Sequence, residues 1–282
     1  RGLGHEVKLM PPIYVTAYVK RGKNDAADAE ALCEAVSRPT MRFVPVKTAE
    51  QQAALMLVGV RERLIQKRTQ LVNAIRGYGA EFGITAATGA CRVVPLLECI
   101  AEDETIPELA RELFALQGKE YAQLQCEIER IDAKLMEWHR NDECSQRLAK
   151  IPGVGPIGAT LLMMKTPDPH LFKSGRDFAA WMGLTPKDHS TAGKTRHGVI
   201  TRAGDELLRS TLVVGATAVV QHARNGRGRN LTPWLIGLIA RKSPKLVAVA
   251  VANKAARVAW KLMVSGERYQ CVAPPALTAV AA

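Results

Sequence analysis

The chain has 282 residues, 47% of them apolar and 23% charged, with a formal net charge of +12. This balance supports a buried core under a charged surface and excludes collagen-like, disulfide-rich and wholly disordered chains. The longest apolar stretch, Leu246–Ala252, is far shorter than the ~20 residues that a membrane span needs. Six cysteines without a CxxC pair are typical of a reduced, cytoplasmic protein without zinc. The length predicts two domains, or one with a long insertion. The first residue is Arg1, which indicates either a removed signal or a fragment of a longer protein, and we expect the fragment.

The charge is distributed unevenly along the chain. Residues 98–148 contain 13 acidic and six basic side chains, whereas residues 222–268 contain ten lysines and arginines against one glutamate. A basic segment of this density favours a surface that binds phosphates, as in DNA or RNA. A solvated face of an unusually basic protein is the alternative. The aromatic share of 5% disfavours an extended stacking platform for single strands.

The first 48 residues mix extended and helical patterns. Apolar and polar residues alternate over His5–Met10, which predicts a short strand that stops at two prolines. Asn24 is a good N-cap for a helix that runs to about Val36. Met41–Val46 is expected to be extended because Pro39 and Pro45 oppose a helix.

Two long helices follow. The first is predicted from Glu50 to a stop at Gly77 and Gly79, and the second from about Pro107 to Arg147. The second helix has apolar residues in heptad steps of three and four: Tyr121, Leu124, Ile128, Ile131, Leu135 and Trp138. The pattern predicts an antiparallel coiled-coil hairpin or an oligomerisation arm. Ordinary helices of a bundle core would show a similar pattern.

From Leu148 onward the sequence is again helical and contains many glycines. Ile151–Gly155 reads IPGVG, which is how a helix-hairpin-helix presents its turn. Glycines allow a phosphate to approach the backbone, and the next helix directs its N–H groups at the anion. A plain tight turn is the competing interpretation. The segment 271–282 has no periodicity and is predicted to be disordered.

Two further groups of residues could carry chemistry. Asp25 and Asp28 are three residues apart, so they share a helix face on which they could bind Mg²⁺ or Mn²⁺. Surface helices often carry such a pair without a metal. Ser190 lies among the cations Lys194, Arg196 and Arg202, which could support attack of its hydroxyl on a phosphodiester. The residues alone favour the alternative, a flexible basic loop in which Ser190 is only a turn residue.

Four segments together resemble the DEDD transposases of insertion sequences. They read KNDAADA from residue 23, IPGVGPIGA from residue 151, GLTPKDHSTAGKTRHGVITRAGDELLR from residue 183 and NKAARVAWKLMVSGERY from residue 253. The resemblance implies a mainly α chain: the C-terminal part of a RuvC-like, ribonuclease-H-type α/β domain (1–48), a coiled-coil arm (49–147), and a helical transposase domain with a helix-hairpin-helix (148–270). The segment 271–282 is then a disordered tail.

The resemblance also implies roles for single residues. Asp25 and Asp28 match the last two acids of a metal-binding tetrad, so we expect half of that site to be missing from this chain. Ser190 matches the nucleophile, with Thr191 in the neighbouring register. Contacts to nucleic acid are expected from seven residues: Gly153, Val154, Gly155, Lys194, Arg196, Arg202 and Arg209.

The expected function is therefore that of a transposase that cuts and rejoins DNA. The resemblance implies Mg²⁺ or Mn²⁺ as cofactor, DNA as partner, a structured guide RNA from the element, and a homo-oligomer. A non-catalytic, DNA-binding remnant of such a transposase is the alternative.

Overall fold

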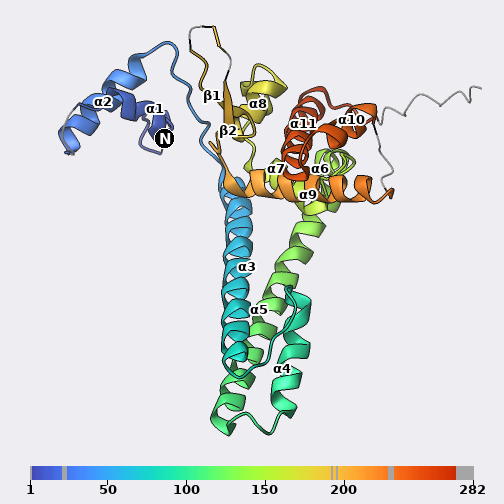
Figure 1. Ribbon diagram of the computed structural model, residues 1–282. Helices are drawn as coiled ribbons and strands as arrows, with labels where there is room; N and C mark the ends of the chain where they lie inside the picture. The colour runs from blue at the N-terminus through green and yellow to red at the C-terminus, as the bar shows by residue number, and fades with distance from the viewer. Residues whose placement is uncertain (1, 21–23, 192, 195, 228–231, 271–282) are drawn as a thin grey trace, which may run out of the picture.

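A computed structural model describes the chain except for residues 1, 21–23, 192, 195, 228–231 and 271–282. The described residues are mainly helical, which confirms the prediction of a mainly α chain. They form a small N-terminal lobe, a long two-helix arm and a C-terminal helical domain from which one β-hairpin projects (Figure 1). The predicted tail, 271–282, lies outside the described residues. Among the helices of the described ranges, none combines the length and the apolar character needed to cross a membrane.

The N-terminal lobe contains two short helices and a minimal core. Helix α1 spans Pro12–Val15, a 3-10 turn follows at Thr16–Tyr18, and α2 spans Asp25–Ser37. Asn24 caps α2 as predicted: its side chain accepts a hydrogen bond from the Ala27 N–H at 2.7 Å. The lobe buries the side chains of Val15, Ala31 and Ala35.

The predicted strand at His5–Met10 is wrong. Leu9 and Val44 form an isolated β-bridge, in which the Val44 N–H donates to the Leu9 carbonyl at 2.8 Å. Prolines stand two residues after Leu9 and next to Val44, and a proline has no N–H with which to extend a ladder. One bridge between two extended segments is the result.

Helix α3 spans Ala49–Glu81 and starts at a capping box of Thr48 and Gln51. It continues through Gly77 and Gly79, where the sequence predicted its end. Gly79 instead lets the chain after α3 come close, because a Cβ there would lie 3.2 Å from the Ile84 carbonyl oxygen. After a 3-10 turn at Ala90–Arg92, helix α4, Val93–Glu102, packs at the tip of the arm.

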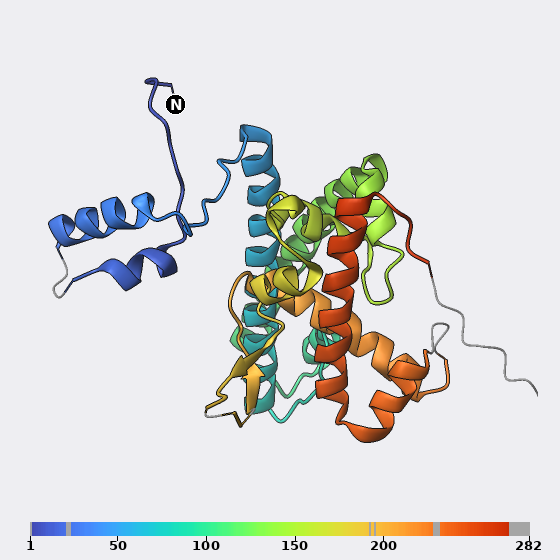
Figure 2. The same ribbon diagram turned by 90° about the horizontal axis from the view of Figure 1, so that it is seen from above.

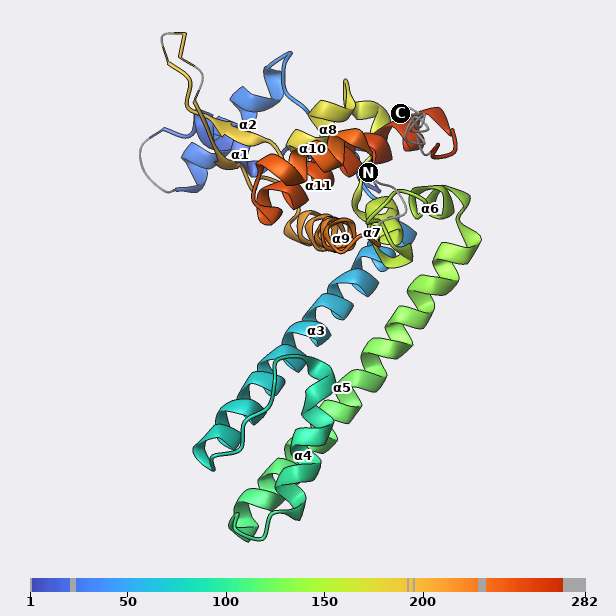
Figure 3. The same ribbon diagram turned by 45° about the vertical axis from the view of Figure 1, so that its right-hand side comes forward.

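Helix α5 spans Glu108–Asn141 and runs antiparallel to α3 (Figure 3). Four of the heptad residues are buried: Tyr121, Ile128, Ile131 and Leu135. The pair is also joined by hydrogen bonds from the Arg61 guanidinium to both Asp132 carboxylate oxygens. The predicted helix to Arg147 is interrupted at Asp142, whose side chain caps a separate helix, α6, at Glu143–Leu148. The apolar heptad residues of α5 thus pack mainly within one chain, as in a coiled-coil hairpin.

The C-terminal domain is built around helices α9 and α11. Its elements are α7, Pro156–Lys165; a 3-10 turn, Pro169–Leu171; α8, Gly175–Trp181; β1, Pro186–Asp188; β2, His197–Ile200; α9, Glu206–Arg224; α10, Pro233–Arg241; and α11, Pro244–Ser265. Alanines line much of the buried side of α11, which lets neighbouring helices approach closely: Ala248, Ala252, Ala255, Ala256 and Ala259. The same core includes Val58, Ile131 and Leu135 from the base of the arm, so arm and domain are packed together.

Candidate catalytic hairpin and nucleic-acid interface

Ser190 lies in a β-hairpin, where the sequence predicted a loop. Strands β1 and β2 pair antiparallel, with Asp188 opposite His197. The pairing continues past β1, because the His189 N–H donates to the Arg196 carbonyl at 2.9 Å and Thr191 forms a bridge with Lys194. The hairpin stands out from the helical domain (Figure 1), so Ser190 is exposed to solvent and accessible to a large substrate.

The hydroxyl of Ser190 is held between two hairpin residues. Its Oγ donates to the Asp188 carboxylate and accepts from the Arg196 N–H at 3.1 Å. The Ser190 N–H donates to the same carboxylate oxygen at 2.9 Å. These two bonds from Ser190 lower the pKa of Asp188, with smaller contributions from His197 and His189. Asp188 is therefore a carboxylate at neutral pH, and it fixes the orientation of the Ser190 hydroxyl.

The base of the hairpin is closed by a tight crossing of two chain segments. A Cβ on Gly183 would lie 2.2 Å from the Ala203 carbonyl oxygen, and one on Gly204 would lie 2.0 Å from the Trp181 carbonyl oxygen. Both glycines have φ values above +70°. Arg209 ties the crossing together: its Nη1 donates to the carbonyls of Ala203, at 3.0 Å, and Met182, at 3.3 Å. The hairpin is thus anchored at its root while its outer part is free.

The predicted cations divide into two groups. Lys194, Arg196 and Arg202 are exposed on or beside the hairpin, and no acidic side chain pairs with them among the described residues. Arg209 is half-buried and is engaged in the crossing. Of the three exposed cations, Lys194 and Arg196 lie on the same hairpin as Ser190, whereas Arg202 lies at its root, where its N–H donates to the Gly183 carbonyl.

Asp25 and Asp28 lie far from the hairpin. Both are exposed in the first turn of α2, and the N-terminal lobe is separate from the hairpin in two perpendicular views (Figures 1 and 2). No three His, Cys, Asp or Glu residues in the described part of the chain lie close enough to hold a metal ion. Two carboxylates supply too few fixed oxygen ligands for Mg²⁺, so these residues do not by themselves fit a metal site.

The IPGVG turn joins α6 to α7. The Val154 N–H donates to the Ile151 carbonyl at 2.9 Å, and Gly153 has φ +83°, as the third residue of a type II turn requires. Gly153 also packs on the backbone of α9 at Gly215. Val154 is buried, whereas Gly155 is exposed at the start of α7 and has open space around its Cα. Close packing thus explains Gly153, and Gly155 alone is accessible for a backbone contact.

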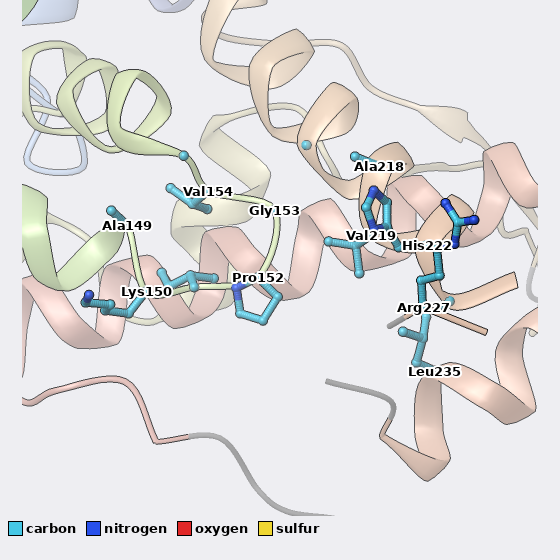
Figure 4. A pocket seen from close by; sticks show the side chains of 14 residues that line it. Ala149, Lys150, Pro152, Gly153, Val154, Ala218, Val219, His222, Arg227 and Leu235 are labelled. Carbon is cyan, nitrogen blue, oxygen red and sulfur yellow. The ribbon is translucent and has the colours of Figure 1, made fainter. Parts of the chain in front are cut away.

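A hollow of about 620 Å³ lies beside this turn, and sequence reasoning missed the basic side chains that line it. Lys150 stands at one end, while His222 and Arg227 stand together at the other (Figure 4). Lys150 is more than 70 positions away from His222 and Arg227 in the sequence. The high basic charge of residues 222–268 was the sequence signal that could have indicated His222 and Arg227.

One serine–histidine pair is structural. His139 Nδ1 lies 2.7 Å from the Ser145 Oγ, as in a nucleophile and its base, but Ser145 is fully buried at the junction of α5 and α6. Its Oγ also lies 3.5 Å from the buried Thr160 hydroxyl. A hydroxyl without access to solvent cannot meet a DNA strand, so this pair stabilises the junction.

Comparison with known proteins identifies the family. A family model described as "Transposase IS116/IS110/IS902 family" matches residues 145–231, and a transposase model for the DEDD enzymes of the IS110 group matches residues 1–78. The chain is 72% identical over 267 residues to the putative transposase y4pF/y4sB of Sinorhizobium fredii, covering 95% of this chain and 69% of that protein.

Two further relatives are named for their insertion sequences. The chain is 40% identical over 264 residues to the transposase for element IS1328 of Yersinia enterocolitica, covering 94% of this chain and 78% of that protein. It is 37% identical over 276 residues to the transposase for element IS1111A of Coxiella burnetii, covering 96% of this chain and 74% of that protein. The chain belongs to the IS110 family of insertion-sequence transposases.

Proposed function

We propose that this transposase binds DNA in the cytoplasm and uses Ser190 as the nucleophile that cuts and rejoins the strands. The observation that carries the proposal is the placement of the Ser190 hydroxyl, which is exposed on a projecting hairpin and oriented by Asp188 and Arg196. A hydroxyl held in this way needs little rearrangement to attack, which is the main contribution that positioning makes to catalysis.

The chemistry at the hairpin is a transesterification. Ser190 Oγ forms a bond to the phosphorus of a phosphodiester, and the bond from phosphorus to the leaving sugar oxygen breaks. The proton of the serine hydroxyl leaves to solvent, and the leaving oxygen takes a proton from solvent. Asp188 orients the hydroxyl but holds a proton poorly, because its pKa is lowered. In this proposal the exposed cations Lys194 and Arg196 on the hairpin stabilise negative charge on the phosphoryl oxygens, and Arg202 at the hairpin root contacts a neighbouring phosphate.

The proposal for Mg²⁺ or Mn²⁺ is limited to Asp25 and Asp28. Their two carboxylates can supply two oxygen ligands, and further ligands are required from other groups. Isothermal titration of Mn²⁺ into the chain and into Asp25→Asn tests the pair; identical heats would exclude Asp25 as a ligand.

DNA ends of the element and its target are the proposed substrates, and association of several copies would hold the cut ends together. A structured guide RNA is proposed from the family resemblance alone. The helix-hairpin-helix around Ile151–Gly155 in the domain 148–270 and the RuvC-like origin of residues 1–48 also remain predictions.

The test is a denaturing gel of labelled DNA carrying element ends. In a protein that contains all four acids of the tetrad, a covalent protein–DNA adduct is expected both with Ser190 and Thr191 intact and with Thr191→Ala. Its loss is expected with Ser190→Ala. Binding measured in parallel should be nearly equal for all three proteins. An adduct that survives Ser190→Ala would overturn the assignment of the nucleophile. Binding without any adduct from the protein with all four acids, Ser190 and Thr191 intact would instead support the non-catalytic DNA-binding remnant.

A further inference from the structure

Two adjoining hollows form one groove on the C-terminal domain, away from the Ser190 hairpin. The larger lies between the IPGVG turn and the second half of α9 (Figure 4). The smaller, about 70 Å³, extends from it toward α10 and α11. They share four lining residues, which form a common apolar floor: Ile151, Pro152, Val219 and Leu235. We call the two together the α9–α10 groove.

The charge of the groove points to an anionic ligand. Among the described residues, its lining includes Lys150, His222, Arg227 and Lys254 and no aspartate or glutamate. In the same part of the chain, neither Lys150 nor Arg227 has an ion-pair partner. Cations without acidic neighbours, spread along an apolar floor, are suited to a chain of phosphates with hydrophobic groups between them.

An aromatic side chain borders the same groove. Trp234, at the start of α10, is 42% exposed, and the Lys254 Nζ lies 4.4 Å from the centroid of its ring. The other three tryptophans are less exposed. An exposed indole beside a lysine combines a stacking surface for a base with a cation for the adjoining phosphate.

We propose that the α9–α10 groove binds an unpaired stretch of nucleic acid, with one base stacked at Trp234 and the neighbouring phosphates on Lys150, Arg227 and Lys254. The low aromatic content excludes a long stacking platform, but one base needs only one indole. The site is a binding site, distinct from the hairpin, and it does not depend on Ser190 chemistry. Single-stranded DNA and single-stranded RNA both offer the groups that the groove would recognise, an unpaired base and its neighbouring phosphates.

The first test measures fluorescence anisotropy of short labelled single-stranded DNA, single-stranded RNA and duplex DNA with the whole chain. Trp234→Ala is expected to weaken single-strand binding about tenfold and to leave duplex binding nearly unchanged. Arg227→Gln should weaken binding of all probes and lower the salt slope by about one. Tyr78→Ala and Arg63→Gln are matched controls, because both residues are exposed on the arm. Equal loss with DNA and RNA supports shared recognition, and a larger loss with one of them identifies the source.

The second test uses tryptophan fluorescence. Stacking of a base should quench the emission of the wild-type chain, and Trp234→Phe should abolish most of the quenching while retaining binding. Ser190→Ala should bind and quench like the wild type, which separates failure of the groove from failure of the nucleophile. Quenching that persists in Trp234→Phe would overturn the proposal. Affinities of Trp234→Ala and Arg227→Gln equal to those of their control variants would also overturn it.

Discussion

Gly153 and Gly215 touch backbone to backbone. A Cβ on Gly215 would lie 1.8 Å from the Gly153 carbonyl oxygen, although the two residues belong to a turn and to the middle of α9. The contact seats the IPGVG turn on α9 and forms the wall between the α9–α10 groove and the helical core. Neither residue can gain a side chain unless α9 moves away from the turn.

We therefore expect Gly215→Ala to lower the free energy of unfolding by about 3 kcal/mol, because overpacking against backbone cannot be relieved by a side-chain rotation. Gly237→Ala is the matched control: Gly237 is also helical but has open space around it. It should raise stability by up to about 1 kcal/mol, the helix propensity difference. Thermal unfolding followed by circular dichroism measures both. A Gly215→Ala protein as stable as Gly237→Ala would show that the contact is not tight.

Arg202 offers a way to separate charge from fold. It is the only described residue other than glycine with a positive φ, +56°. Arg202→Gly relieves roughly 1 kcal/mol of backbone strain, which the greater freedom of the unfolded chain largely offsets. We expect an unchanged melting temperature and weaker, less salt-dependent DNA binding, measured by anisotropy. Arg202→Gln should lose the same affinity. Wild-type binding by both variants would exclude Arg202 as a phosphate contact.

The bond between Asp188 and Ser190 makes a prediction about pH. Because hydrogen bonds from Ser190 lower the pKa of Asp188, their contribution to hairpin order is present above the pKa of the unfolded chain. It is lost in acid, as the pH falls through the lowered pKa of the folded hairpin. An NMR titration of the Asp188 carboxyl carbon should show a higher midpoint in Ser190→Ala than in the wild type. Equal midpoints would contradict the hydrogen bond.

Two faces of α5 should respond differently to charge. Ile131 is 7% exposed and packs within the arm, so Ile131→Asp should cost about 3 kcal/mol or more of stability. Leu113 is 51% exposed on a row that also contains Leu109 and Leu116. Leu113→Asp should keep the melting temperature and reduce the mass seen by light scattering, if copies associate through this row. An unchanged mass would place the oligomer contact elsewhere.

Local signals in the sequence predicted much of the helical structure. The Asn24 cap and the heptad seam depend on residues within one or two turns of each other, and both were found where expected. Helix α3 ends at Glu81, two residues beyond the predicted stop at Gly79. The chain that leaves the helix turns back onto Gly79, whose carbonyl accepts from the N–H groups of Phe82 and Ile84, so this glycine lies just inside the helix end.

The hairpin was missed for a different reason. Its strands are exposed at nearly every position, so the sequence lacks the alternation that a half-buried sheet imposes. Ser190 was found through the family resemblance, and its partner Asp188 was not. An aspartate two residues before a serine is a common turn signal that could have indicated it. The α9–α10 groove was not predictable, because only tertiary packing brings Lys150 and Arg227 into the lining of one groove.

The length of α3 has a geometric consequence. With 33 residues at 1.5 Å each, the helix is about 50 Å long, more than one ~34 Å turn of B-form DNA. Pairing with α5 stiffens α3, so the arm holds its tip at a fixed distance from the helical domain. Removing one heptad from each helix would shorten the arm by about 10 Å while preserving the faces that meet. The number of heptads in the two helices therefore sets the distance between ligands bound at the two ends of the arm.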